Sequence, residues 1–219
     1  MTFQEIVNRS RELALYPMGA FHVDGIEDGL PEGTNTVVLL GPDEPGVFWE
    51  IFVRGTEYLD GEPDPLDRWS RRTAGKLAHI LPEAEVVYPF DGPPFLPFAD
   101  WAVRTGHVWV SPVGLLVHDE AGLWVSFRAA LALKTRLNLP EPTEKPCDTC
   151  EGQPCRTACP VAALTPEGYD VPRCKAYVTS EEGEHCRVQG CAVRRACPVS
   201  QRWKREEAQA HFHMEAFLA

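Results

Sequence analysis

All eight cysteines of this 219-residue chain lie in one short segment, between Cys147 and Cys197. They form two runs that each end in a Cys-Pro pair: Cys147-x2-Cys150-x4-Cys155-x3-Cys159-Pro160, and Cys174 followed by Cys186-x4-Cys191-x5-Cys197-Pro198. Eight thiols make two sets of four, and a four-iron cluster takes one thiolate on each of its irons. The number and spacing of the cysteines therefore predict two [4Fe-4S] clusters, whose chemistry is the transfer of single electrons.

The repeated Cys-Pro ending predicts how these ligands divide. In bacterial two-cluster ferredoxins, the fourth cysteine of such a run ligates the other cluster. The same crossing gives one cluster the ligands Cys147, Cys150, Cys155 and Cys197, and gives the other Cys159, Cys174, Cys186 and Cys191. No cysteine is left over.

Three other uses of cysteine fit the segment less well. A disulfide framework suits a small secreted domain, but residues 1–15 are polar and helix-periodic and lack the unbroken apolar core of a secretion signal. Zinc ribbons usually pair two CxxC knuckles, and this chain has only the one at Cys147 and Cys150. Free cysteines buried as small hydrophobic residues would not all gather in under a quarter of the chain.

Charge is unevenly distributed along the chain. Residues 1–146 contain 12 Lys and Arg against 22 Asp and Glu, whereas residues 147–219 contain 9 against 10. The net charge of −11 argues against nucleic acid as the main partner, because binding a phosphate backbone needs a Lys/Arg surface. No apolar stretch approaches the roughly 20 residues of a membrane helix. We therefore expect a cytoplasmic protein with no membrane partner, in a compartment where thiols stay reduced.

Helix and strand signals alternate in the first part of the chain. We expect helices over residues 2–15 and 65–81, and strands around residues 20–23, 36–40, 85–88, 107–109, 115–118 and 123–127. Three prolines among residues 138–146 indicate a connector. Residues 201–218 are typical of a terminal helix that docks through Trp203, Phe212 and Phe217. The mixture indicates the α+β class.

Three stretches of the cysteine segment carry a family pattern: Cys159-Pro160-Val161-Ala162-Ala163-Leu164, Arg173-Cys174-Lys175-Ala176-Tyr177-Val178-Thr179, and Gly190-Cys191 leading to Cys197-Pro198. Weaker matches precede them in residues 104–110, 114–117 and 122–127. In these stretches the chain resembles the epoxyqueuosine reductases, a family that shares its plan with the corrinoid-dependent reductive dehalogenases.

The resemblance implies a nitroreductase-like N-terminal α/β layer domain over residues 1–140, a bacterial ferredoxin-like two-cluster domain over residues 141–200, and a C-terminal helix over residues 201–219. It also implies a cobalamin between the first domain and the clusters. In this family an Asp in an Asp-x-x-Pro setting supplies a proton to the substrate, and Asp91-Gly92-Pro93-Pro94 matches that setting. Asp91 is therefore the candidate catalytic acid, and its structural alternative is a turn residue that bonds nearby backbone.

The chain also departs from the family pattern. Its first run has four residues, not two, between the second and third cysteines, and Arg194 stands where the family has a cysteine that Cys186 replaces from upstream. A guanidinium beside a reduced cluster would raise its potential. The family's Gly-Lys-Asn turn is replaced by residues 111–114, and the chain ends at Ala219, before the helical repeats that help the family hold tRNA. We therefore do not expect tRNA as the substrate.

Together these features predict an iron–sulfur oxidoreductase that relays single electrons through two clusters to a corrinoid or small substrate in the first domain. The expected partners are that small molecule or corrinoid and an electron donor such as a reductase, a flavodoxin or a ferredoxin. Two alternatives stay open: a ferredoxin-like electron carrier without a corrinoid, and a protein that reduces or handles a corrinoid. Visible absorbance separates them, because a corrinoid adds bands to the colour of the clusters.

Overall fold

The computed structural model describes residues 1–25, 27, 29–44, 46–165, 168–203 and 205–219, which form two compact units of mixed helix and strand. The first unit contains residues 1–108 and 126–143, and the second contains residues 109–125 and 144–219. The predicted α+β class is confirmed. The domains predicted at 1–140, 141–200 and 201–219 stay predictions, because compactness alone does not show which segments fold independently.

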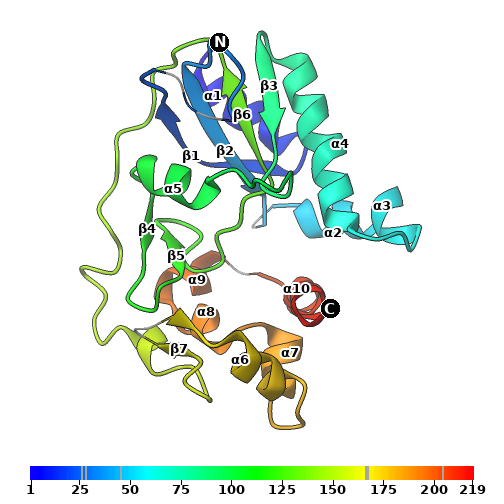
Figure 1. The fold of residues 1–219 in the computed structure, drawn as a ribbon, viewed down its shortest axis with the longest axis vertical. Helices are drawn as coiled ribbons and strands as arrows, with labels where there is room; N and C mark the ends of the chain where they lie inside the picture. Colours follow the sequence, from blue (N-terminus) through cyan, green and yellow to red (C-terminus); the bar gives the residue numbers. More distant parts are fainter. Residues whose placement is uncertain (26, 28, 45, 166–167, 204) are drawn as a thin grey trace. The chain divides into compact units, whose positions relative to one another are not determined.

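A four-stranded antiparallel sheet forms the centre of the first unit (Figure 1). Its strand order is β1 (Leu15–His22), β2 (Thr36–Pro42), β6 (Ala129–Leu133) and β3 (Ala84–Val87). Every residue of β2 and β6 is buried. A strand that is covered on both faces carries apolar residues at successive positions instead of alternating ones, as Val37 to Leu40 do.

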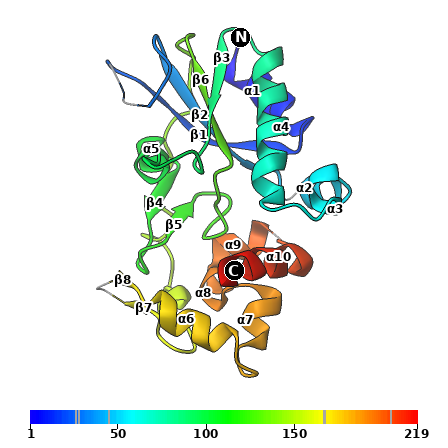
Figure 2. The ribbon, with the colours of Figure 1, turned by 45° about the vertical axis from the view of Figure 1, so that its right-hand side comes forward.

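Helices cover both faces of this sheet (Figure 2). The helices α1 (Phe3–Arg11) and α4 (Pro65–Ile80) lie on one side, and α5 (Phe98–Arg104) lies on the other. Two short helices, α2 (Phe48–Val53) and α3 (Thr56–Leu59), follow β2 in the chain. The helix α4 begins with proline at its first position, which suits a residue without an N–H group. Its residues Leu66, Trp69 and Leu77 form a buried apolar stripe, whereas Ile80, which the helical period places on the same stripe, is exposed.

The second unit carries all the cysteines. Its regular elements are two small sheets, a 3-10 turn and five helices among the described residues: β4 (Val108–Val110) with β5 (Leu116–His118), η1 (Pro154–Arg156), β7 (Leu164–Thr165) with β8 (Gly168–Tyr169), α6 (Val171–Val178), α7 (Glu184–Gln189), α8 (Ala192–Ala196), α9 (Pro198–Trp203) and α10 (Glu207–Leu218). The elements from η1 to α9 are short, so the cysteines lie close to element ends. No helix among the described residues is both long and apolar enough to cross a bilayer.

Several predicted elements need correction. The first helix ends at Arg11 instead of residue 15, because Ala14 takes a left-handed φ of 56° and Leu15 begins β1. Residues 123–127 form no strand, and the Leu123 N–H group donates to Ser200 Oγ at 2.8 Å instead of to a strand partner. The predicted terminal helix is two helices, α9 and α10; Lys204, between them, lies outside the described residues.

Candidate metal centre

The structure brings the eight thiols together as two groups of four, both within the second unit. The thiol of Cys147 interacts electrostatically with those of Cys150, Cys155 and Cys197, and we call these four residues the first group. In the second group, the thiol of Cys174 interacts with those of Cys159, Cys186 and Cys191. This is the crossed division that the two Cys-Pro runs predict. That each group binds a cluster stays a prediction.

Three segments position the first group. Cys147 and Cys150 lie in the loop that leads to η1, Cys155 lies within η1, and Cys197 ends α8 just before α9 begins. The group rests on an apolar core made by the β4 and β5 region and the helices α8 and α9. The buried members of that core are Val117, Leu123, Cys155, Val193, Cys197 and Val199. Cys197 therefore joins the first group because α8 packs against η1, not because of sequence proximity.

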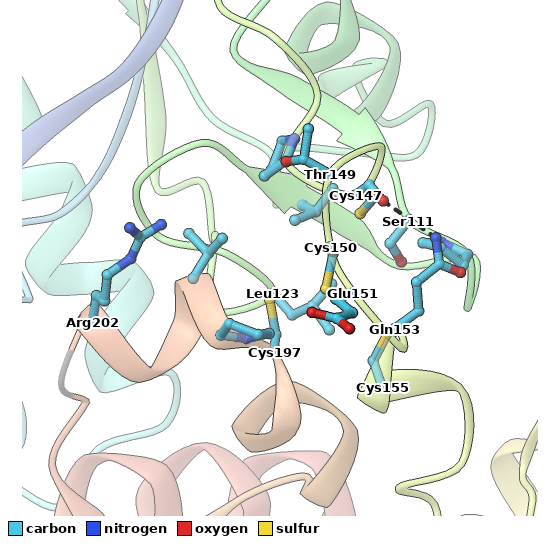
Figure 3. A pocket seen from close by; sticks show the side chains of 15 residues that line it. Ser111, Leu123, Cys147, Thr149, Cys150, Glu151, Gln153, Cys155, Cys197 and Arg202 are labelled. Atoms are coloured by element: carbon cyan, nitrogen blue, oxygen red, sulfur yellow. Dashed lines mark hydrogen bonds between the residues drawn. The ribbon is translucent and has the colours of Figure 1, made fainter.

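A cavity of about 440 Å³ opens beside the first group (Figure 3). All four of its cysteines line this cavity, together with polar residues that include Glu151, Gln153 and Arg202. The hydroxyl oxygen of Ser111, also in the lining, is buried and has no hydrogen-bond partner among the described residues. Because all four sulfurs of the first group line this cavity, a cluster bound to them would occupy part of it, with the polar groups beside it.

The longer loop of the first run has a structural role. Gln153 takes a left-handed φ of 39°, and its side-chain Nε2 donates to the Cys147 backbone oxygen at 3.2 Å, as Figure 3 shows. The Gln153 Oε1 atom accepts from Arg156 at 3.2 Å. The two additional residues therefore close a turn that fixes the backbone of the first ligand.

Polar groups lie beside the sulfurs of the second group. The Ala163 N–H group donates to Cys159 Sγ at 3.2 Å, and Cys186 Sγ lies 3.4 Å from His185 Nε2. The Ala192 N–H group beside Cys186 and the Tyr169 hydroxyl beside Cys174 oppose the rise of the pKa of those thiols. Donors of this kind favour the more negative state of a cluster and are one of the means by which proteins set its potential.

The thiols themselves fit an iron–sulfur cluster. All eight are free, and burial raises the pKa of Cys147, Cys155, Cys174 and Cys186. Unligated, these groups would be neutral, so metal binding would release protons. Among the described residues, no three His, Cys, Asp or Glu side chains converge on a point suited to one metal ion. Each thiolate of a four-iron cluster binds a different iron, and each group offers four free thiols.

Arginines lie beside the second group. The guanidinium of Arg195 lies near Cys186 and opposes the rise of its thiol pKa, and the same side chain donates to the Gly190 backbone oxygen at 3.2 Å. Arg194 donates to the Leu123 backbone oxygen and lies near Tyr169. Cys186 stands in the second group, as expected for the residue that replaces the family's missing cysteine.

Asp91 lies in the first unit, on the loop after β3. Its carboxylate accepts hydrogen bonds from both terminal nitrogens of Arg71, whose guanidinium also lies 4.8 Å from the Tyr88 ring centroid and 5.0 Å from that of Phe90. The structural alternative, in which this carboxylate caps its own turn, is not what the side chain does. To donate a proton to a substrate, the Asp91 carboxyl would have to leave Arg71. Its catalytic role stays a prediction.

Two contributors to the site were missed by sequence reasoning. Tyr169 lies five positions before Cys174 in the sequence. Gln153 lies in the loop between Cys150 and Cys155, which is longer than in the family pattern. The extra length of that loop was the available signal for Gln153. Tyr169 carried no signal, because its contact depends on the β7–β8 hairpin that the sequence did not reveal.

Comparison with known proteins adds fold-level likenesses. No protein-family model matches the chain, and no curated protein matches it. Among solved structures, epoxyqueuosine reductase from Streptococcus thermophilus shares 16% identity with a TM-score of 0.49 over 92% of this chain and 67% of the other. The Bacillus subtilis enzyme, with its catalytic loop swung out of the active site, shares 15% identity with a TM-score of 0.47 over 93% of this chain and 66% of the other. A third, solved with an epoxyqueuosine-modified tRNA stem loop, shares 15% identity with a TM-score of 0.45 over 94% and 69%.

This chain therefore spans about two thirds of the length of those proteins. They belong to the family whose cysteine motifs the sequence resembles. In fold, this chain is similar to the epoxyqueuosine reductases.

Proposed function

We propose that this protein is an iron–sulfur oxidoreductase that relays single electrons through two [4Fe-4S] clusters to a corrinoid or a small substrate. One observation carries the proposal: the eight thiols lie in two groups of four whose membership crosses their order in the sequence. Zinc ribbons pair neighbouring knuckles, whereas interleaved ligation is the habit of two-cluster ferredoxins. The second unit is on this proposal the ferredoxin-like part, and the first unit is the nitroreductase-like part.

The residues of this chain would contribute in three ways. The first group and the second group would each hold one cluster, which supplies reversible one-electron reduction when bound. The apolar residues Val117, Leu123 and Val199, which line the same cavity, would pack against its cluster. The donors around the second group would stabilise its reduced state.

The cavity that the first group lines is where an electron would leave or enter. Its lining includes the four sulfurs of that group and reaches the surface through polar residues such as Glu151 and Arg202. The first cluster would itself fill part of this cavity, so a small molecule or the edge of a larger cofactor in the rest of it would lie next to the cluster. A corrinoid is the leading acceptor, on the family resemblance alone, and a reductase, flavodoxin or ferredoxin would supply the electrons.

Anaerobic purification followed by iron and acid-labile sulfide analysis tests the proposal. We expect about eight irons and eight sulfides per chain, from four thiolates on each of two clusters. Titration with cobalamin then tests the acceptor: bands of protein-bound corrinoid should appear beside the cluster absorbance, and dithionite-reduced clusters should pass electrons to it. Stoichiometric zinc with little sulfide would end the proposal.

The second candidate function is an electron carrier without substrate turnover. The Arg71–Asp91 ion pair favours it, because the one predicted proton donor is already engaged by two hydrogen bonds. Such a carrier would contain both clusters, bind no corrinoid and pass electrons only to a protein partner.

The substitution Asp91→Asn separates the two candidates. It keeps the shape of the side chain and removes the proton, so an enzyme that uses Asp91 as general acid should lose roughly 10²–10⁴-fold in turnover. Cluster content should not change, because Asp91 lies in the other unit from the cysteines. The matched control is Asp100→Asn, an exposed residue of the first unit. Equal turnover in both variants would reject the role of Asp91 and leave the carrier function.

A further inference from the structure

Ser111 lies in the turn between β4 and β5, and its side chain is among those that line the cavity of the first group (Figure 3). The turn holds its backbone through two hydrogen bonds. The Ser111 N–H group donates to the Leu115 backbone oxygen at 2.8 Å, and the Ser111 backbone oxygen accepts from the Gly114 N–H group at 3.0 Å. The next residue, Pro112, has a fixed φ. The turn therefore fixes the point from which the Ser111 side chain leaves the backbone.

The Ser111 hydroxyl is a buried polar group. The residue is only 6% exposed, and its hydroxyl oxygen has no hydrogen-bond partner among the described residues. The other described residues that the β4–β5 region contributes to the cavity are apolar: Pro112, Val117 and Leu123. Folded proteins leave few buried hydroxyls unpaired, because such a group has given up its hydrogen bonds to water. The Ser111 hydroxyl therefore requires an acceptor that enters the cavity.

The composition of the cavity indicates what that acceptor is. Gln153 is engaged in the turn that bonds the Cys147 backbone, and Thr149, Glu151 and Arg202 are exposed. The remaining groups with acceptor atoms in the described side-chain lining are the four sulfurs of the first group. A four-iron cluster bound to them would bring its own sulfides into the cavity beside these thiolates. Negatively charged sulfur is thus the acceptor that the bound state supplies.

We propose that the Ser111 hydroxyl donates a hydrogen bond to a sulfur of the first cluster and thereby raises the reduction potential of that cluster. The inference rests on the proposed function, since it requires a cluster on the first group. Reduction adds one electron from the reductant and neither makes nor breaks a covalent bond, so the sulfurs become more negative. A hydroxyl donor then stabilises the reduced form more than the oxidised form, and the potential rises.

The test is a reductive titration of the purified two-cluster protein with dithionite and mediators, followed by electron paramagnetic resonance, which resolves the two clusters. Ser111→Ala removes the donor and breaks no hydrogen bond among the described residues, so both clusters should assemble. We expect the ratio of reduced to oxidised first cluster at a fixed solution potential to fall roughly tenfold, which is 59 mV for a one-electron couple. The second cluster should keep its potential, because the described lining of the cavity includes none of its cysteines.

Ser10→Ala is the matched control. Ser10 is also buried, and its hydroxyl oxygen likewise has no hydrogen-bond partner among the described residues, but it lies in α1 of the first unit. The substitution deletes the same atom, and both cluster potentials should equal those of the unchanged protein. A first-cluster potential that is the same in Ser111→Ala and Ser10→Ala would overturn the proposal, and a water molecule in the cavity would then be the better partner for the hydroxyl.

A measurement on the unchanged protein covers the case in which Ser111→Ala assembles only four irons. Electron–nuclear double resonance of the reduced first cluster detects the protons coupled to it, and those that disappear when the clusters are assembled in D₂O are exchangeable. We expect an exchangeable proton coupled to the first cluster, and its absence would overturn the proposal. An unchanged protein that lacks iron and sulfide would instead refute the proposed function, so the two failures are distinct.

Discussion

The two cysteine groups use the same ligands in different surroundings. The first group rests on apolar residues and opens on a cavity of about 440 Å³. The second group lies among α6, α7 and α8, and its Cys159 sulfur receives a hydrogen bond from the Ala163 N–H group. Identical thiolate sets can hence give clusters of unlike potential, because hydrogen bonds and solvent access, not the ligands alone, set it. The first group thus borders a cavity, and the second lies among helix ends and polar groups.

Cys159→Ser should give the largest effect, because it tests whether the groups are crossed at all. Cys159 closes the first sequence run but belongs to the second group. We expect the variant to lose the second cluster, about four of eight irons, and to keep the first cluster. Iron analysis and electron paramagnetic resonance would measure this. The matched control is Cys155→Ser, which lies four positions earlier and should lose the first cluster instead. Loss of the same cluster in both variants would contradict the crossing.

Cys186→Ala tests how the second group is completed. Cys186 is buried and stands with Cys159 and Cys191, while Arg194 bonds the Leu123 backbone oxygen. We expect the variant to lose the second cluster or to convert it to a species with three irons, since one iron would lack its thiolate. Spectroscopy of the frozen oxidised protein would detect such a species. If both four-iron clusters persist, another ligand completes the second, and an open iron site becomes the better explanation.

The ligand division was predictable from the sequence because the Cys-Pro runs repeat and no thiol is left over. The side chains that surround the thiols were not predictable from the sequence. Tyr169 and Phe217, for example, lie 48 positions apart, and their rings meet only because α10 brings Phe217 to this part of the unit. Among the elements, the central strand β6 was missed because Ala129-Ala130-Leu131-Ala132-Leu133 has helix-forming residues and no alternation. Its burial between β2 and β3 overrides that preference.

Gly122→Ala should have a smaller effect, which lowers the stability of the structure around the first group. Gly122 has a φ of 58°, and a Cβ atom there would lie 2.4 Å from the Ser200 backbone nitrogen, on the helix that follows Cys197. We expect the free energy of unfolding to fall by about 3 kcal/mol, from the left-handed φ and the overlap together. Gly114→Ala is the matched control, because Gly114 has a φ of 77° with nothing within 4 Å of the added Cβ. It should lose only about 1 kcal/mol.

Thermal unfolding of the two glycine variants, with iron release followed in the same samples, measures that difference. The first cluster should be released earlier in Gly122→Ala than in Gly114→Ala, while the second cluster should behave alike in both. Equal stability of the two variants would mean that α9 moves away from the β5 turn at little cost. The apolar residues around the first group would then rearrange at a lower free-energy cost than their burial indicates.

The smallest expected effect is that of a substitution at Gln153, in the turn between Cys150 and Cys155. The side-chain nitrogen of Gln153 donates to the Cys147 backbone oxygen at 3.2 Å, and its oxygen accepts from Arg156. Gln153→Glu keeps the size of the side chain and an acceptor for Arg156 but removes the donor to Cys147. Since one such bond contributes about 1 kcal/mol, iron should leave the first cluster about fivefold faster when a chelator is added anaerobically. The second cluster of the same protein is the internal control, because the hydrogen bonds of the Gln153 side chain go to Cys147 and Arg156 and not to a cysteine of the second group. If iron left both clusters faster by the same factor, the substitution would destabilise the whole second unit. The turn would then not stabilise the first group specifically.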